Sequence, residues 1–83
     1  MNNRPIDDVL NEGMRLMKKI DLSNEMVEIW ARYSLDIINL ISRNNFLKYQ
    51  YSSIVANAML SNDTPNKKLD NCLRFLISNY SII

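Results

Sequence analysis

The chain has 83 residues, of which ten are basic and nine acidic, and it contains one cysteine and no histidine. Histidine is the usual acid–base residue near neutral pH and the commonest metal ligand, so its absence argues against most hydrolytic and metal-dependent sites. A net charge of +1 also lacks the clear basic excess of proteins that bind nucleic acid mainly through its phosphates.

The first predicted helix spans residues 5–20. Pro5 suits the first helical position, and apolar residues recur at helical spacing through Ile6, Val9, Leu10, Gly13, Met14, Met17 and Ile20. Glycine inside a helix costs about 1 kcal/mol relative to alanine. We therefore expect another helix backbone to approach closely at Gly13.

The second predicted helix spans residues 24–43, with Ser23 as its N-terminal cap. Its apolar residues cover about 180° of the helix surface. They are Met26, Val27, Ile29, Trp30, Tyr33, Ile37, Ile38, Leu40 and Ile41. An arc this wide indicates a helix that is central or contacted from two sides, and Trp30 lies near the middle of the arc.

The third and fourth predicted helices span residues 46–60 and 65–80. Asn44 and Thr64 can cap them, and Pro65 opens the fourth. The third has an inner line at Leu47, Tyr51, Ile54, Val55 and Ala58 and an outer line at Tyr49, Ser53, Ala56 and Leu60; the fourth has Leu69, Cys72, Leu73, Leu76 and Tyr80. Short connections favour antiparallel neighbours. The sequence therefore predicts an all-α fold, a small antiparallel four-helix bundle forming one domain over residues 1–83.

No catalytic, cofactor-binding or metal-binding residue is predicted, and we expect the protein not to be an enzyme. The carboxylates of Asp7, Asp8 and Glu12 lie opposite an apolar stripe, which indicates a solvated surface and not a sheltered catalytic cleft. Cys72 falls on the buried stripe of the fourth helix, where a thiol acts as a small apolar group.

Residues 34–40, which begin Ser34-Leu35-Asp36, resemble the Asp-Ser-Leu prosthetic-group site of acyl carrier proteins, which are four-helix proteins of similar size. Two departures separate this chain from that pattern. Tyr33 stands where the family has its aspartate, and the glycine-containing loop before the serine is missing. We therefore expect Ser34 to be a buried serine on a helix face.

Residues 51–76 can also be drawn as a helix-turn-helix unit, with Lys67, Lys68 and Arg74 facing phosphate. Under this alternative the protein is a DNA-binding transcriptional regulator. The connection at residues 61–65 is longer than the short turn of that motif, and the net charge is nearly zero. Solvated surface lysines therefore explain these cations better.

The chain holds more apolar residues than one small bundle can bury. The surplus consists of Ile29, Leu35, Leu40, Tyr49, Ala56, Leu60, Phe75, Ile82 and Ile83. This surplus is either an interface, which we favour because apolar surface on this scale normally marks one, or additional core in a packing that periodicity does not show. A domain of this size is near the lower limit of independent stability, so we expect a protein partner and self-association as a homodimer.

These features together predict a small interaction module that regulates or inhibits another protein by binding to it. We expect it to be cytoplasmic, because Asp7 and Asp8 stand where a signal peptide would be apolar and a single cysteine suits a reducing compartment. The frequent asparagine, isoleucine and lysine indicate an AT-rich coding sequence, as in a low-GC bacterium, its phage or a plasmid.

Overall fold

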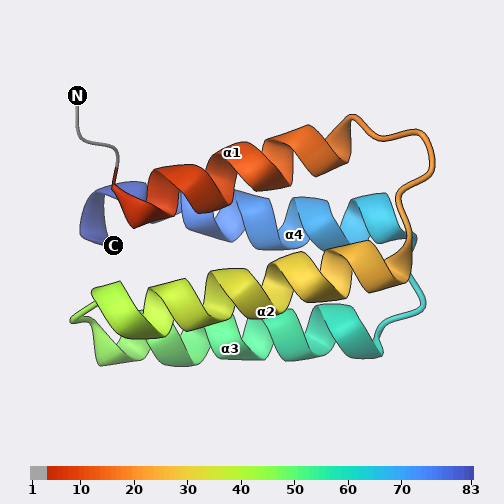
Figure 1. The fold of residues 1–83 in the computed structure, drawn as a ribbon. Helices are drawn as coiled ribbons and strands as arrows, with labels where there is room; N and C mark the ends of the chain where they lie inside the picture. The colour runs from red at the N-terminus through yellow and green to blue at the C-terminus, as the bar shows by residue number, and fades with distance from the viewer. Residues whose placement is uncertain (1–3) are drawn as a thin grey trace.

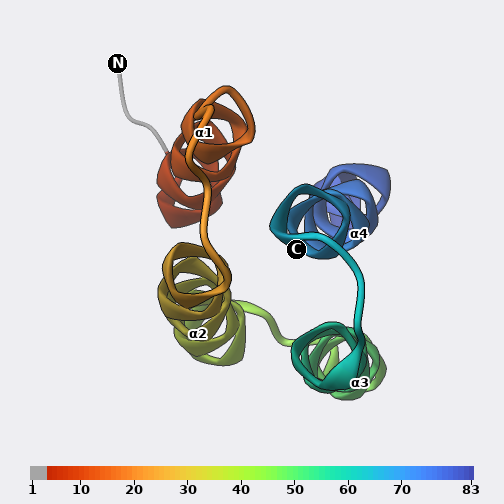
Figure 2. The same cartoon turned by 90° about the vertical axis from the view of Figure 1, so that its right-hand side faces the viewer.

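The computed structural model describes residues 4–83, which form four α-helices, one short 3₁₀ helix and no strand. The elements are α1 (Pro5–Met17), α2 (Asn24–Ile41), α3 (Asn45–Leu60), α4 (Pro65–Ser78) and the 3₁₀ helix η1 (Tyr80–Ile82). Successive helices run in opposite directions (Figure 1), and an end-on view places them at four corners (Figure 2). The predicted all-α, antiparallel four-helix bundle is confirmed.

The helix starts follow the expected capping chemistry. Ser23, Asn44 and Thr64 each accept, through the side-chain oxygen, a hydrogen bond of 3.0–3.3 Å from the backbone N–H three residues later. Pro5 and Pro65 occupy first-turn positions, where no intrahelical N–H is needed. Local sequence thus fixes where each helix begins.

The helix ends were predicted less well, and α1 is the clearest case. The backbone N–H of Lys18 bonds to the carbonyl oxygens at the end of α1, and the helix stops at Met17 and not at residue 20. Ile20, expected on the buried stripe, is fully exposed in the connection to α2. Leu22, two residues later, is buried in the core, and the chain must depart from the helical path of α1 to bring this side chain into the core.

The buried face of α1 is also rotated relative to the prediction. Met14 is 43% exposed, whereas Leu16, which was not assigned to the stripe, is buried. The expectation that Met14 is a core residue is therefore wrong. At the other end of the chain, α4 ends at Ser78 and Tyr80 belongs to η1, so that the fourth helix is shorter than residues 65–80.

The wide apolar arc of α2 has a structural explanation. This helix packs against α1, α3 and α4, as α4 does against the other three helices, whereas α1 and α3 lie at opposite corners of the bundle. Figure 2 shows α2 and α4 on the inner diagonal of the bundle. The prediction of a helix that is central or contacted from two sides is confirmed, but this packing accounts only for the buried part of the arc, because Ile29, Tyr33 and Leu40 remain exposed.

Gly13 lies where three helices meet. A Cβ atom built on Gly13 would lie 2.7 Å from Leu73 Cδ2 of α4 and 2.9 Å from Trp30 Cζ2 of α2. The close approach predicted at this glycine is present, but side chains make it and not a helix backbone. The Trp30 indole fills the space that any larger residue at position 13 would occupy.

None of the helices within residues 4–83 combines the length and the apolar character that crossing a membrane requires.

Candidate functional site

The surplus apolar residues differ widely in exposure. Large exposed fractions are found at Ile29 (62%), Leu40 (80%), Tyr49 (72%), Leu60 (84%) and Ile82 (54%), and Ala56 is also exposed. Leu35, Phe75 and Ile83 are half-buried. The Phe75 ring stacks on Tyr51, with centroids 5.5 Å apart and planes inclined by 20°, so one side of Phe75 belongs to the core.

The exposed members do not form one patch, because, apart from Ile82 in η1, they follow two lines on different helices. On α2 they belong to a stripe of apolar side chains at three- and four-residue spacing, Met26, Ile29, Tyr33, Ile37 and Leu40, which we call the α2 stripe. On α3 they belong to the outer line Tyr49, Ser53, Ala56 and Leu60, which points away from the core. The structure therefore presents two separate apolar surfaces.

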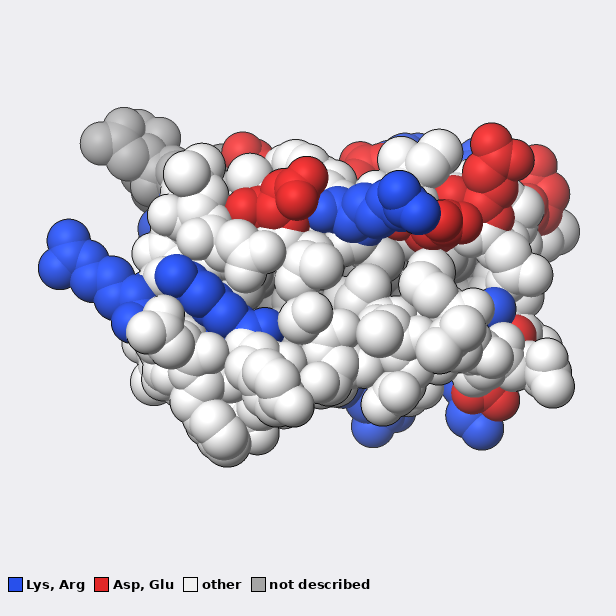
Figure 3. All heavy atoms as spheres, turned by 90° about the horizontal axis from the view of Figure 1, so that it is seen from below, with Lys and Arg blue, Asp and Glu red and all other residues white. Residues whose placement is uncertain are grey.

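The outer surface of α3 is almost free of charge. Lys48 is the one charged residue between Asn45 and Leu60. Viewed from the side on which α2 and α3 lie in Figure 1, the molecule shows a broad uncharged area bordered by rows of acidic and basic side chains (Figure 3). This surface offers apolar contact without a preferred charge in its partner.

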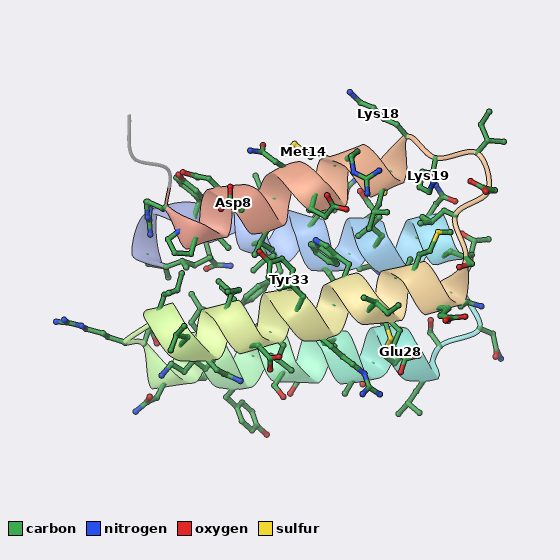
Figure 4. The ribbon with its side chains drawn as sticks, viewed as in Figure 1. Asp8, Met14, Lys18, Lys19, Glu28 and Tyr33 are labelled. Carbon is green, nitrogen blue, oxygen red and sulfur yellow. The ribbon has the colours of Figure 1, made fainter. Side chains whose placement is uncertain are left out.

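The α2 stripe borders a groove between α1 and α2. Its open cavity of about 270 Å³ is lined by Glu12 and Leu16 of α1 and by Met26, Ile29, Trp30 and Tyr33 of α2, and we call it the α1–α2 groove. The groove is almost wholly apolar, and Trp30 and Leu16 are nearly inaccessible, so they form its floor. In Figure 4, Tyr33 lies on the side of α2 that faces α1.

The groove has acidic surroundings. Asp8 on α1 and Glu25 and Asp36 on α2 form no ion pair with any residue in the described part of the chain. Three cations of α1, α2 and their connection are engaged locally, since Arg15 pairs with Glu12, Lys19 with Asp21 and Arg32 with Glu28. The Arg15 hydrogen bond holds the pKa of the Glu12 carboxyl below its usual value, so Glu12 is ionised at neutral pH.

The cations of the DNA-binding alternative are poorly placed for phosphate. Lys67 Nζ lies 3.8 Å from an oxygen of Asp63, and Arg74 Nε bonds to Asp70 at 2.7 Å. Lys68, expected to be a solvated surface lysine, is only 7% exposed. In addition, α3 and α4 run antiparallel (Figure 1) and not at the steep angle of a helix-turn-helix. This geometry does not favour DNA binding.

A buried polar chain crosses the core, and sequence reasoning missed it. The Ser34 hydroxyl lies 2.6 Å from the Tyr51 hydroxyl and 2.7 Å from the Ala31 carbonyl oxygen. Cys72 of α4 is also fully buried and interacts with Tyr51. Desolvation raises the pKa of the Cys72 thiol to about 11. Desolvation also raises the pKa of the Tyr51 hydroxyl well above its usual value. These groups are neutral, internal and paired, and the expectations of a buried Ser34 and a buried Cys72 are confirmed.

The two ends of the described chain meet in a polar cluster. Arg4 donates a 2.7 Å hydrogen bond from its guanidinium to the carbonyl oxygen of Ile83, and its guanidinium carbon lies 5.0 Å from the centre of the Tyr80 ring. The Tyr80 hydroxyl donates a hydrogen bond to Asp7, which lowers the pKa of that carboxyl. The cluster joins α1 to η1 and has a structural role.

Comparison of the chain with protein-family models, curated proteins and solved structures finds no match. Within residues 4–83 no group of three or more acidic or cysteine side chains converges in a way that could hold a metal ion. What the structure does present is apolar surface: one groove with acidic surroundings and one uncharged helix face. Such surfaces bind other apolar surfaces.

Proposed function

We propose that this protein is a small interaction module that regulates or inhibits another protein by binding to it. The observation that carries the proposal is the exposure of large apolar side chains along the α2 stripe, where Ile29 at the α1–α2 groove and Leu40 further along α2 are both more than 60% exposed. Burying one such side chain contributes about 1.5–3 kcal/mol. A few anchors of this kind around a preformed groove account for most of the energy of a specific interface.

The proposal includes a cytoplasmic location and self-association as a homodimer. Self-association is assigned to the outer line of α3, because an uncharged face can meet its own copy across a two-fold axis without repulsion. Light scattering measures this directly. We expect twice the 9.7 kDa chain mass at micromolar concentration, and a shift to the monomer in Leu60→Glu. A wild-type monomer at that concentration would remove the homodimer from the proposal.

The interaction function is tested by capture followed by reconstitution. A photo-crosslinking amino acid at Tyr33 or at Tyr49 samples the two surfaces in cells of the native host. The protein captured is then purified, and its binding and activity are measured with the wild-type chain, Ile29→Glu and Leu60→Glu. Both substituted residues are more than 60% exposed, so both variants retain the fold, which far-UV circular dichroism and urea unfolding check.

We expect the purified partner to bind the wild-type chain, to change its activity on binding, and to lose at least tenfold in affinity with one of the two variants. Two results would contradict the proposal. One is a partner bound equally well by both variants, and the other is full partner activity at saturating concentrations of the chain.

A further inference from the structure

We propose that the α1–α2 groove binds one amphipathic helix of the partner, with the apolar face of that helix in the groove and lysines or arginines along its flanks. This inference rests on the proposed function and specifies the chemistry of the partner. Binding of an amphipathic helix in an apolar groove is a common mode of peptide recognition.

The dimensions of the surface fit a helix of a few turns. The α2 stripe extends from Met26 to Leu40, which at 1.5 Å per residue is about 21 Å, the length of a helix of about 14 residues. Trp30 and Leu16 form a floor that is already buried, so the groove does not need to open. The exposed side chains of Ile29 and Leu40 stand near the two ends of the stripe and can contact successive turns of the bound helix.

Charge determines which helix fits. Asp8 lies one helical turn before the groove residue Glu12 on α1, and Glu25 and Asp36 are exposed on α2, all three without an ion-pair partner among residues 4–83. Basic flanks on the bound helix would face these carboxylates. Complementary charge of this kind sets orientation and selectivity, while the apolar contacts supply most of the affinity.

The same charges argue against a second copy of the chain in this groove. A two-fold interface places a surface against itself, so the unpaired carboxylates of one copy would approach those of the other. The outer line of α3 has no such constraint. The two apolar surfaces therefore suit different occupants, a copy of the chain at α3 and a basic helix at the α1–α2 groove.

The test uses two synthetic peptides of about 16 residues that share leucines at helical spacing and differ only in their flanks, lysine in one and glutamate in the other. Isothermal titration calorimetry measures their affinity for the full chain. We expect the lysine-flanked peptide to bind at least tenfold more tightly than the glutamate-flanked one. Ile29→Ser should weaken its binding at least tenfold, whereas Leu60→Ser, a matched change on the exposed face of α3, should leave it unchanged.

A charge-reversed variant provides the sharpest test of the charge preference. In the double variant Asp8→Lys, Asp36→Lys, the preference should invert, and the glutamate-flanked peptide should bind more tightly than the lysine-flanked one. Both residues are exposed, and neither forms an ion pair with another residue in the part of the chain that the structure describes. Urea unfolding of each variant confirms that binding is compared between folded proteins.

Absence of binding by the lysine-flanked peptide would overturn the inference. So would equal binding of that peptide to the wild-type chain and to Ile29→Ser, or an unchanged preference for the lysine-flanked peptide in the charge-reversed variant.

Failure of the helix-binding inference is distinguishable from failure of the proposed function. If Leu60→Glu alone releases the captured partner, the interaction function stands and the helix-binding groove does not. If the peptides behave as expected but no captured partner responds to either variant, the groove stands and the regulatory function does not.

Discussion

The indole N–H of Trp30 donates a 3.0 Å hydrogen bond to the backbone carbonyl oxygen of Val9 in the middle of α1. This bond joins α2 to α1 beneath the α1–α2 groove, and Gly13, one turn beyond Val9, leaves room for the ring. The floor of the groove is therefore fixed by a hydrogen bond as well as by packing. A fixed floor keeps the exposed side chains of the α2 stripe in a defined position.

Trp30→Phe should destabilise the fold moderately, and Trp30→Ala should abolish it. Phenylalanine keeps most of the ring volume but loses the bond to Val9, for an expected cost of about 2 kcal/mol from the bond and a small cavity. Alanine leaves a cavity worth about 3–5 kcal/mol, a large part of the stability of so small a domain. Urea unfolding followed by far-UV circular dichroism measures both. Equal stability of the two variants would mean that Trp30 does not hold α1 against α2.

Gly13→Ala should lower stability even though alanine is the better helix former. The helix gain is about 1 kcal/mol, but the new methyl group would overlap the Trp30 ring, and overpacking costs typically about 1–3 kcal/mol. Asn11→Ala, at an exposed position of the same helix, is the matched control and should raise the melting temperature slightly. A rise in both variants would show that the contact at Gly13 is loose.

Ser34→Ala and Tyr51→Phe should each destabilise the protein by about 1–3 kcal/mol, because each leaves a buried hydroxyl with one partner fewer. The double variant should cost less than the sum of the two, since the penalty of an unpaired hydroxyl is then removed. Chemical denaturation of the four proteins gives the coupling energy. Strict additivity would show that the 2.6 Å contact contributes nothing.

Stability should fall with rising pH above pH 9. The pKa of Cys72 is about 11 in the fold and 9.0 in an ordinary setting, so the stabilisation from its neutral thiol is complete below pH 9 and is lost as the pH rises towards 11. Urea midpoints across this range should decline less steeply in Cys72→Ala, and the remaining decline should come from Tyr51 and Tyr80, whose pKa values are also raised. In the native protein a thiol reagent should react far more slowly than in the urea-unfolded chain. A flat profile and a fast native reaction would contradict the burial of this thiol.

Helix starts could be predicted from the sequence because caps and first-turn prolines are local signals. Ser23, Thr64 and Pro65 need only a few neighbouring residues to act. Helix ends depend on tertiary packing, which explains why the predicted ends of the first helix, which stops at Met17, and of the fourth helix, before Tyr80, were wrong. Leu22 is buried beyond the end of α1 and Tyr80 bonds to Asp7 beyond the end of α4, and neither interaction is visible in helical periodicity.

The candidate site was only partly predictable for the same kind of reason. Periodicity identified Ile29 as a surplus apolar residue, but not its position in the lining of a groove, because the predicted buried face of α1 is wrong at Met14 and Leu16. It also could not show that the α2 stripe and the outer line of α3 are separate surfaces. That separation depends on how the helices are placed around the bundle.

The most direct test of the interaction account is a nuclear magnetic resonance titration of the isotope-labelled chain with the purified partner. We expect the backbone signals of Ile29, Tyr33 and Leu40 to shift or broaden on binding, while those of the buried α4 residues Leu69 and Leu76 stay in place. Signals that remain unchanged along the α2 stripe at saturating partner would contradict the claim that this protein acts through the α1–α2 groove.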